Sequence, residues 1–305
     1  MTIDHNLIAI EPKSFEAYEA AVIAAGAKVS PLNSHVGGLI WTDYSQPEAL
    51  GILIDENPQL EWVQLPFAGV DAFSQVLRKP IRFTSAKGAY AEPVAEHALA
   101  LCLALGRAIP ERVMAKSWGR KFAVSLYEAN VVIVGGGGIT EELLRQLKPF
   151  RCKVTVVRKR PTNSAGHLEL PQGQLDEVLP KADFVVLACA LTAETLHLFS
   201  DERFSKMKPE AYLVNVARGR VIDSEALDRA LRAGLIAGAG IDVTDPEPLP
   251  DEHFLWNTPN LIITPHTADT KPMVLRMFAR RILENVSAYQ GKTEWVGLVD
   301  PQLGY

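Results

Sequence analysis

The stretch VVIVGGGGITEELL at residues 131–144 contains the first residues whose types and spacing suggest chemistry. Its apolar run predicts a strand, four glycines follow, and the remaining residues predict the first turns of a helix. In a strand–turn–helix unit that binds a dinucleotide, the first glycine makes a tight turn and the second lets the backbone approach a pyrophosphate. Gly135 and Gly137 stand in these two places. The stretch therefore predicts a dinucleotide-binding turn.

The start of the predicted helix supports the same interpretation. Gly138 and Ile139 open it, and the N–H groups at a helix N-terminus bind phosphate oxygens. Thr140, however, stands where the motif has its third glycine, which allows helix and strand to pack closely. A tight strand-to-helix turn without a ligand therefore stays open as the alternative at this point.

A basic run follows the next predicted strand. Arg158, Lys159 and Arg160 lie roughly 20 residues after the glycines, where an Asp or Glu would bind the ribose 2′-hydroxyl of NAD. This run has no acidic residue, and cationic groups suit a 2′-phosphate instead. We expect NADP(H) to be the preferred cofactor, with NAD possible. A solvated basic turn is the alternative.

Composition narrows the class of protein. With 305 residues, of which 48% are hydrophobic and 22% charged, the chain suits a globular protein of about two domains. A formal net charge of -5 gives no reason to expect a nucleic acid or an anionic membrane surface as a partner. A small anionic substrate is compatible with this charge, because local basic sites occur in acidic proteins.

Cysteines and apolar segments predict a cytoplasmic protein. Cys102, Cys152 and Cys189 lie far apart, with neither metal-ligand spacing nor a dense disulfide pattern, so we expect buried thiols and no metal site. The longest apolar region, residues 89–105, contains charged residues and predicts a buried helix rather than a membrane span. The first residues, MTIDHNLIAIEP, are too acidic for a signal peptide.

Short apolar runs alternate with helix-like segments along the chain, which is the pattern of parallel sheets covered by helices. We expect an α/β fold with two doubly wound parallel-sheet domains, a flavodoxin-like substrate domain and a Rossmann dinucleotide-binding domain. The first hundred residues predict strands at NLIAI, GLIWT, EWVQL and IRFT. Six more strands, which fit a complete dinucleotide-binding sheet, are expected at VVIV, VTVV, FVVLA, AYLVN, IAGAGID and LIIT.

The predicted domains follow from these two sets of strands. Residues 1–97 would form the substrate domain, 98–270 the dinucleotide-binding domain, and 271–305 a C-terminal segment that returns to the substrate domain. Residues 92–118 predict two consecutive helices, broken near Pro110, that bridge the domains. A cleft between the domains is the expected binding site.

Three further motifs occur in order after the glycine turn. They are NVARG at residues 215–219, DVTDPEP at 242–248 and TPHTAD at 264–269. With them the sequence resembles the D-isomer-specific 2-hydroxyacid dehydrogenase family over nearly its whole length. The resemblance implies hydride transfer between NAD(P)H and a small 2-keto acid, with glyoxylate or hydroxypyruvate as the first candidates.

The resemblance also implies roles for three side chains. Arg218 would bind the carboxylate of the 2-keto acid and polarise its carbonyl, which suits a planar fork of donors with permanent charge. His266 would donate a proton to the carbonyl oxygen, because imidazole exchanges protons near neutrality. Glu247 would orient the imidazole and stabilise its protonated form. Taken singly, a salt-bridged loop residue, a strand cap and a turn acid are the alternatives.

Other residues are placed by the same resemblance. Backbone N–H groups at Ala68, Gly69 and Val70 would meet the substrate carboxylate, while Ala217 and Asp242 would contact the cofactor. By contrast, we expect His97, in the predicted interdomain helix, to be a hydrogen-bonded packing residue rather than a catalyst.

Departures from the family pattern concern both activity and function class. Besides Thr140, Ala190 replaces a usual proline, and Asp269 replaces a usual small residue and would add negative charge beside His266. Activity on common small keto acids is therefore expected to be weak. A dinucleotide-sensing corepressor on the same fold is the alternative function. A homodimer is expected by resemblance, with contacts at residues 96–118.

Overall fold

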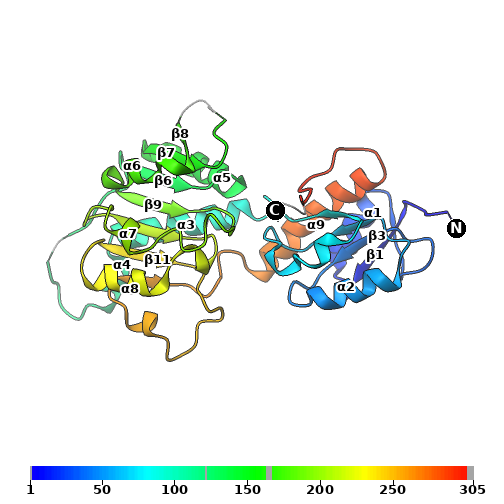
Figure 1. Ribbon diagram of the computed structural model, residues 1–305, viewed down its shortest axis with the longest axis horizontal. Coiled ribbons are helices and arrows are strands. Elements are labelled where there is room, and N and C mark those ends of the chain that lie inside the picture. Colours follow the sequence, from blue (N-terminus) through cyan, green and yellow to red (C-terminus); the bar gives the residue numbers. More distant parts are fainter. Residues whose placement is uncertain (1, 121, 163–166, 301–305) are drawn as a thin grey trace. The chain divides into compact units, whose positions relative to one another are not determined.

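The computed structural model describes residues 2–120, 122–162 and 167–300. None of the helices among these residues combines the length and the apolar character that crossing a bilayer requires. Figure 1 shows the succession of helices and strands along the chain.

Two compact units make up the chain. The first, called the N-terminal unit, combines residues 1–90 with 270–305, and the second, called the central unit, contains residues 91–269. The first boundary therefore falls after Tyr90 rather than after residue 97 as expected. The reason is that helix α3 (Ala91–Gly106) packs along its length against α5 (Gly138–Leu147) within the central unit.

The N-terminal unit contains a parallel sheet with strand order β2-β1-β3-β4-β5. This is the flavodoxin-like order that was expected. Helices α1 and α9 pack against each other on one side of the sheet, and α2 lies on the other side (Figure 1). The strands are β1 (Leu7–Glu11), β2 (Lys28–Val29), β3 (Gly38–Trp41), β4 (Trp62–Gln64) and β5 (Arg82–Thr84). The helical segments are α1 (Glu16–Ala24), α2 (Pro47–Glu56), η1 (Asp71–Phe73), η2 (Val76–Arg78) and α9 (Lys271–Tyr289).

The central unit contains a parallel sheet with strand order β12-β11-β10-β9-β6-β7-β8. Counted from β6, this is the Rossmann order with one added strand at the β12 edge, so the predicted fold class is confirmed. The strands are β6 (Asn130–Val134), β7 (Lys153–Arg158), β8 (Leu168–Pro171), β9 (Phe184–Leu187), β10 (Tyr212–Asn215), β11 (Gly238–Ile241) and β12 (Leu261–Ile263).

Helices cover both faces of this second sheet because β6 is apolar on both sides. Val131 and Ile133 pack in a core with α3 and α5, whereas Val132 and Val134 pack in another core with α8 (Ser224–Arg232). The remaining helical segments are α4 (Ile109–Met114), η3 (Lys148–Phe150), η4 (Gln172–Gln174), α6 (Leu175–Val178), η5 (Leu179–Lys181), α7 (Asp201–Phe204), η6 (Gly219–Val221) and η7 (Phe254–Asn257).

Two expectations about strands need correction, whereas the predicted break between the two helices is confirmed. The second sheet has seven strands in the described residues instead of six, because β8 was missed. Strand β2 was also missed, since it has only two residues and both are exposed. The break between α3 and α4 lies near Pro110, as expected, and Pro110 itself lies in the first turn of α4, where its missing N–H costs nothing. Ala108, with φ of 50°, makes the break.

Candidate active site

Two glycines of the turn after β6 have different surroundings. Gly135 has φ of 124°, and a Cβ there would lie 2.3 Å from the carbonyl oxygen of Ala188. A side chain at this position is therefore excluded by the fold itself. A Cβ at Gly137, in contrast, would have no atom within 4 Å. The backbone before α5 is thus bare and accessible, as an approaching pyrophosphate requires.

Thr140, the departure from the glycine motif, is accommodated inside α5. Its side chain is buried, and its hydroxyl donates a hydrogen bond of 3.1 Å to the carbonyl oxygen of Gly135. The hydroxyl therefore ties the first turn of the helix to the glycine turn. The substitution leaves the dinucleotide turn intact.

Of the three cations at the end of β7 and directly after it, Arg158 reaches the glycine turn. A Cβ on Gly136 would lie 2.3 Å from its Nε, so the guanidinium crosses the turn in space that only glycine leaves free. Lys159 pairs instead with Glu194, with an Nζ to Oε2 distance of 2.8 Å, and Arg160 is exposed. Arg158 is therefore the cation best placed to meet a phosphate group.

A carboxylate lies beside Arg158 that sequence reasoning missed. Glu169 on β8 is buried, with Oε1 at 3.6 Å from Nη1 of Arg158. It accepts hydrogen bonds from the backbone N–H of Thr162 and from His167. The hydrogen bond from Thr162, with smaller contributions from His167 and Arg158, lowers the pKa of Glu169 to about 2. The acid was missed because β8 itself was missed.

The loop after β10 places Arg218. Asn215, buried at the end of the strand, accepts a hydrogen bond from the N–H of Ala217 and donates one to the carbonyl of Arg218. A Cβ on Gly219 would lie 1.9 Å from the carbonyl oxygen of Thr244, so only glycine fits there. The Arg218 loop is thereby packed, backbone against backbone, on the segment that leads to Glu247.

The structure places His266 and Glu247, which the sequence predicts to act together, in direct contact. Nδ1 of His266 is hydrogen-bonded to Oε1 of Glu247. This bond raises the pKa of His266 and lowers the pKa of Glu247, because each charge stabilises the other. Since Nδ1 faces the carboxylate, Nε2 is the nitrogen that can exchange a proton with a substrate.

Asp242 organises the loop that carries His266. Its buried carboxylate accepts hydrogen bonds from the Thr264 hydroxyl (2.6 Å) and from the N–H groups of Thr267 (2.9 Å) and Ala268 (3.0 Å). The N–H of His266 donates to the Asp242 carbonyl at 2.8 Å. Burial opposes ionisation, but the hydrogen bonds outweigh it and lower the pKa of Asp242.

His97 takes part in the same arrangement. Its Nε2 lies 2.9 Å from the Thr264 hydroxyl oxygen and 3.3 Å from Oδ1 of Asp242. It is thus a hydrogen-bonded residue, as expected, and it helps to hold the His266 loop. Among the described bonds, Oδ2 of Asp242 accepts only the N–H of Ala268, which leaves it capacity for one more donor.

Asp269 lies within electrostatic range of the same side chains. Burial raises the pKa of its carboxyl group, the positive charges of His266 and Arg218 lower it, and Asp242 raises it further. The net direction is upward. An acidic side chain is therefore part of the surroundings of Arg218 and His266.

Ala68, Gly69 and Val70 belong to the other compact unit, in the loop after β4. In the described part of the chain, the N–H groups of these three residues bind no acceptor. Consecutive free N–H groups form a site that suits an anion. The described residues contain no group of His, Cys, Asp and Glu placed to hold a metal ion.

Comparison with known proteins decides the family. Residues 98–268 match the model of the D-isomer specific 2-hydroxyacid dehydrogenase NAD binding domain. A glyoxylate reductase of Pyrococcus furiosus is 33% identical over 253 residues, which cover 78% of this chain and 75% of that protein. The chain belongs to the D-isomer-specific 2-hydroxyacid dehydrogenase family. It is an NAD(P)-dependent oxidoreductase that transfers a hydride between the nicotinamide and a 2-hydroxy or 2-keto acid.

Two further relatives of this dehydrogenase are informative. The glyoxylate reductase/hydroxypyruvate reductase of Mus musculus is 36% identical over 211 residues, which cover 65% of this chain and 64% of that protein. A D-isomer specific 2-hydroxyacid dehydrogenase from Xanthobacter autotrophicus, solved with NADPH and MES, has a TM-score of 0.84 and 26% identity. That similarity covers 98% of this chain and 99% of the other.

Proposed function

We propose that this dehydrogenase reduces small 2-keto acids, with glyoxylate and hydroxypyruvate as the first substrates to test. The observation that carries the proposal is the hydrogen-bonded pair of His266 and Glu247, with Arg218 on a loop packed against the Glu247 segment. Relatives named glyoxylate reductase and glyoxylate reductase/hydroxypyruvate reductase support this choice of substrate. The paired acid and base also favour an enzyme over a dinucleotide-sensing corepressor.

In this mechanism Arg218 holds the substrate. Its guanidinium binds the carboxylate through one set of donors and polarises the carbonyl through the other. The N–H groups of Ala68, Gly69 and Val70, in what we take to be the substrate domain, are proposed to bind the same carboxylate. When bound, the nicotinamide supplies the hydride, and Ala217 and Asp242 are proposed to contact the cofactor.

His266 supplies the proton that balances the reaction. The hydrogen bond to Glu247 raises the pKa of His266 and so favours the protonated imidazole, and Nε2 donates the proton to the carbonyl oxygen as the hydride reaches the carbonyl carbon. The neutral imidazole that remains takes up a proton from water. Glu247 stabilises the imidazolium before transfer and orients the ring throughout.

The test is an absorbance assay of the purified protein with NADPH and either keto acid. Consumption of NADPH that depends on the keto acid, together with loss of turnover in His266→Ala, is the expected result. Binding of NADPH without turnover of glyoxylate, hydroxypyruvate, pyruvate or phenylpyruvate would contradict the proposal.

We also propose that NADP(H) is preferred over NAD(H). Arg158 lies across the glycine turn, and a 2′-phosphate would gain a charge-assisted hydrogen bond from it. Lys159 and Arg160 would contribute positive charge to the same site. Comparison of kcat/KM for NADPH and NADH tests the preference, which equal or better use of NADH would refute. Arg158→Gln should reduce the preference.

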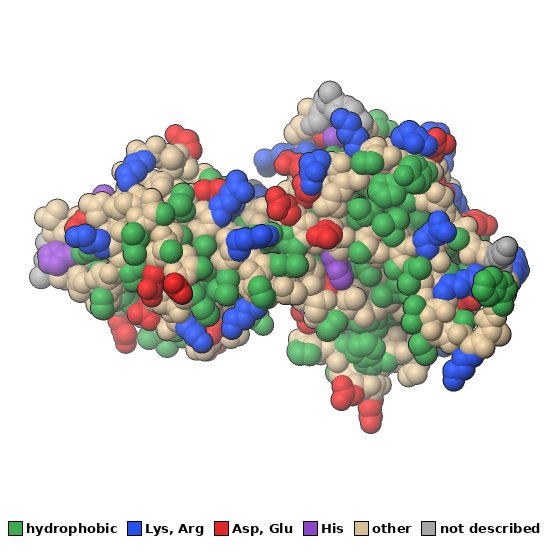
Figure 2. Space-filling model, turned by 180° about the vertical axis from the view of Figure 1, so that it is seen from behind, with side chains coloured by type: hydrophobic (Ala, Val, Ile, Leu, Met, Phe, Trp, Pro, Cys, Tyr) green, Lys and Arg blue, Asp and Glu red, His purple; other side chains and the backbone are tan. Residues whose placement is uncertain are grey.

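A homodimer is proposed from an exposed apolar segment of the central unit. Ile109, Val113 and Met114 on α4 are exposed, and Trp118 is 90% exposed. The face of α3 that includes Leu101 is instead buried within the chain, so the expected contact narrows to α4 and the residues after it. Figure 2 shows hydrophobic side chains at the surface of this unit.

A second copy of the chain is the proposed partner of this segment, since large apolar side chains that are exposed close together on a folded protein mark an interface. Light scattering after size exclusion should give a dimer for the wild type and a monomer for Trp118→Asp. A monomeric wild type at micromolar concentration would refute the dimer.

A further inference from the structure

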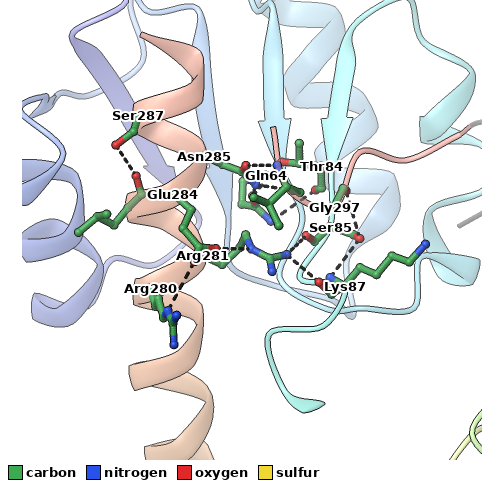
Figure 3. Close-up of polar contacts among 12 residues, drawn as sticks. Gln64, Thr84, Ser85, Lys87, Arg280, Arg281, Glu284, Asn285, Ser287 and Gly297 are labelled. Atoms are coloured by element: carbon green, nitrogen blue, oxygen red, sulfur yellow. Dashed lines mark hydrogen bonds and ion pairs between the residues drawn. The ribbon is translucent and has the colours of Figure 1, made fainter. Parts of the chain in front are cut away.

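Helix α9 sends buried polar side chains to the carboxyl ends of β4 and β5, as Figure 3 shows. Nδ2 of Asn285 donates to Oε1 of Gln64 at 2.6 Å, and the Thr84 hydroxyl donates to the same oxygen at 2.8 Å. Gln64 and Thr84 are the last residues of their strands, and all three side chains are fully buried. The helix is therefore fixed to that end of the sheet by specific hydrogen bonds rather than by apolar packing alone.

Arg281, one turn before Asn285, makes the next contact along the helix (Figure 3). Its Nη1 donates to the carbonyl oxygens of Ser85 and Lys87, each at 2.9 Å. Its Nε donates to Glu284 at 3.0 Å. The side chain is only 7% exposed. Burying a cation is costly unless its donors are matched, and here one guanidinium binds two carbonyls of the same turn.

The turn that Arg281 binds is itself attached to the loop after β4. The N–H of Ala86 donates to the carbonyl oxygen of Phe67 at 3.0 Å, and the hydroxyl of Tyr90 donates to the carbonyl oxygen of Pro66 at 2.6 Å. Phe67 immediately precedes the three residues whose N–H groups bind no described acceptor. A continuous set of hydrogen bonds thus runs from α9 to that loop.

A glycine closes the other side of the turn. Gly297 has φ of 71°, and its carbonyl accepts the N–H of Ser85 at 2.7 Å. A Cβ at this position would lie 2.4 Å from the Ser85 carbonyl oxygen and 3.0 Å from Nη1 of Arg281. The turn is therefore enclosed between Arg281 and the backbone at Gly297, where a side chain would not fit.

We propose that Arg281 is a positioning residue for substrate binding, which it serves by holding the turn at residues 85–87 and, through it, the loop at residues 66–70. This rests on the proposed function, in which that loop binds the keto-acid carboxylate. Arg281 does not touch the substrate. It sets where the loop's N–H groups lie, and small displacements of such groups weaken binding strongly.

Arg281→Met is the test, with Arg280→Met as the matched control. Arg280 is the neighbouring residue on α9, is 81% exposed and pairs only with Glu284 at 3.5 Å among the described contacts. Hydrogen exchange followed by mass spectrometry would report the N–H groups of Ser85 and Ala86, of which the second donates to Phe67 in the loop. Steady-state kinetics with glyoxylate and hydroxypyruvate would report KM and kcat, and fluorescence titration would report NADPH affinity.

The expected result is faster exchange at Ser85 and Ala86 in Arg281→Met, because the Ala86 N–H bonds the turn to Phe67, with unchanged NADPH affinity. KM for the keto acid should rise about tenfold, the factor that corresponds to one lost charge-assisted hydrogen bond. Arg280→Met should match the wild type. Unchanged exchange in a folded Arg281→Met protein, or faster exchange with unchanged KM, would overturn the proposal. A lower Tm with unchanged KM would show a purely structural role.

A conservative variant covers the case in which Arg281→Met does not fold. Arg281→Lys keeps the charge but has one nitrogen in place of a fork, so KM should rise less and exchange should increase less. Wild-type values of both in Arg281→Lys would overturn the proposal. If the wild type reduces neither keto acid, the proposed function fails, while the exchange experiment still decides whether Arg281 holds the loop.

Discussion

The loop that carries His266 and the loop at residues 68–70 use their backbone N–H groups differently. In the first, the N–H groups of His266, Thr267 and Ala268 all donate to Asp242. In the second, the N–H groups of Ala68, Gly69 and Val70 bind no acceptor in the described part of the chain. The N–H donors of the first loop fix that loop to Asp242, and those of the second loop are available to a ligand. We therefore expect substitutions near the first to change turnover and substitutions that disturb the second to change KM.

His266→Ala should give the largest effect on turnover. Removal of the general acid should lower kcat by about 10²- to 10⁴-fold. NADPH affinity should be nearly unchanged, because the dinucleotide turn is built from other residues. Stopped-flow or steady-state reduction of glyoxylate, with fluorescence titration of NADPH as the control, measures both quantities. Unchanged turnover would remove His266 from the mechanism.

Arg218→Lys should affect both substrate binding and turnover, because Arg218 is proposed to bind the carboxylate and to polarise the carbonyl. An ammonium group cannot reproduce the planar fork, so kcat/KM should fall by about 10²-fold, with both KM and kcat affected. Kinetics with glyoxylate measure the change. A near-normal enzyme would mean that Arg218 only supports the loop between Asn215 and Gly219.

Glu247→Gln should change the pH dependence more than the maximal rate. The pKa of His266 is raised chiefly by its hydrogen bond to Glu247, and reduction needs the imidazolium. The rate of reduction is therefore full below that pKa and is lost as pH rises through it. Without the carboxylate the pKa falls, so the loss should occur at lower pH, with a decrease of about tenfold near neutrality. An unmoved pH profile of kcat/KM would contradict this account.

Asp269→Asn should give the smallest effect and in the opposite direction. Removing a negative charge near Arg218 should improve binding of an anionic keto acid, lowering KM by about threefold, as expected for a partly exposed charge. kcat should stay close to the wild-type value. KM measured at low and high salt provides the control, since the difference should shrink at high salt.

Much of this architecture was predictable because its signals are local. Apolar runs such as VVIV and FVVL predicted the main strands. Strand β8 gave no such signal, since LELP contains a glutamate and a proline. Its loss from the prediction also hid Glu169, which lies beside Arg158 through strand pairing alone.

Sequence motifs could not predict contacts between residues that lie far apart in the sequence. Gln64 and Asn285 are separated by 221 positions, and neither belongs to a recognisable pattern, yet they share a buried hydrogen bond. Thr140 was counted against the dinucleotide turn because the motif expects glycine, while its hydroxyl in fact bonds to Gly135. A motif specifies residue types at given spacings. Whether another residue can replace a motif residue depends on where the fold places its polar atoms, such as the hydroxyl oxygen of Thr140.

The close approach of Gly219 to Thr244 limits how this protein can vary. Because the two backbones touch where a methyl group would overlap a carbonyl, an alanine at 219 would force both loops apart. If position 219 is randomised and the variants are selected for activity, only glycine should be recovered. This holds even though Gly219 contacts neither substrate nor cofactor in the proposed mechanism. A new substrate range in this chain is therefore expected to arise from changes of side chains, while the spacing between the Arg218 loop and the Thr244 segment stays the same.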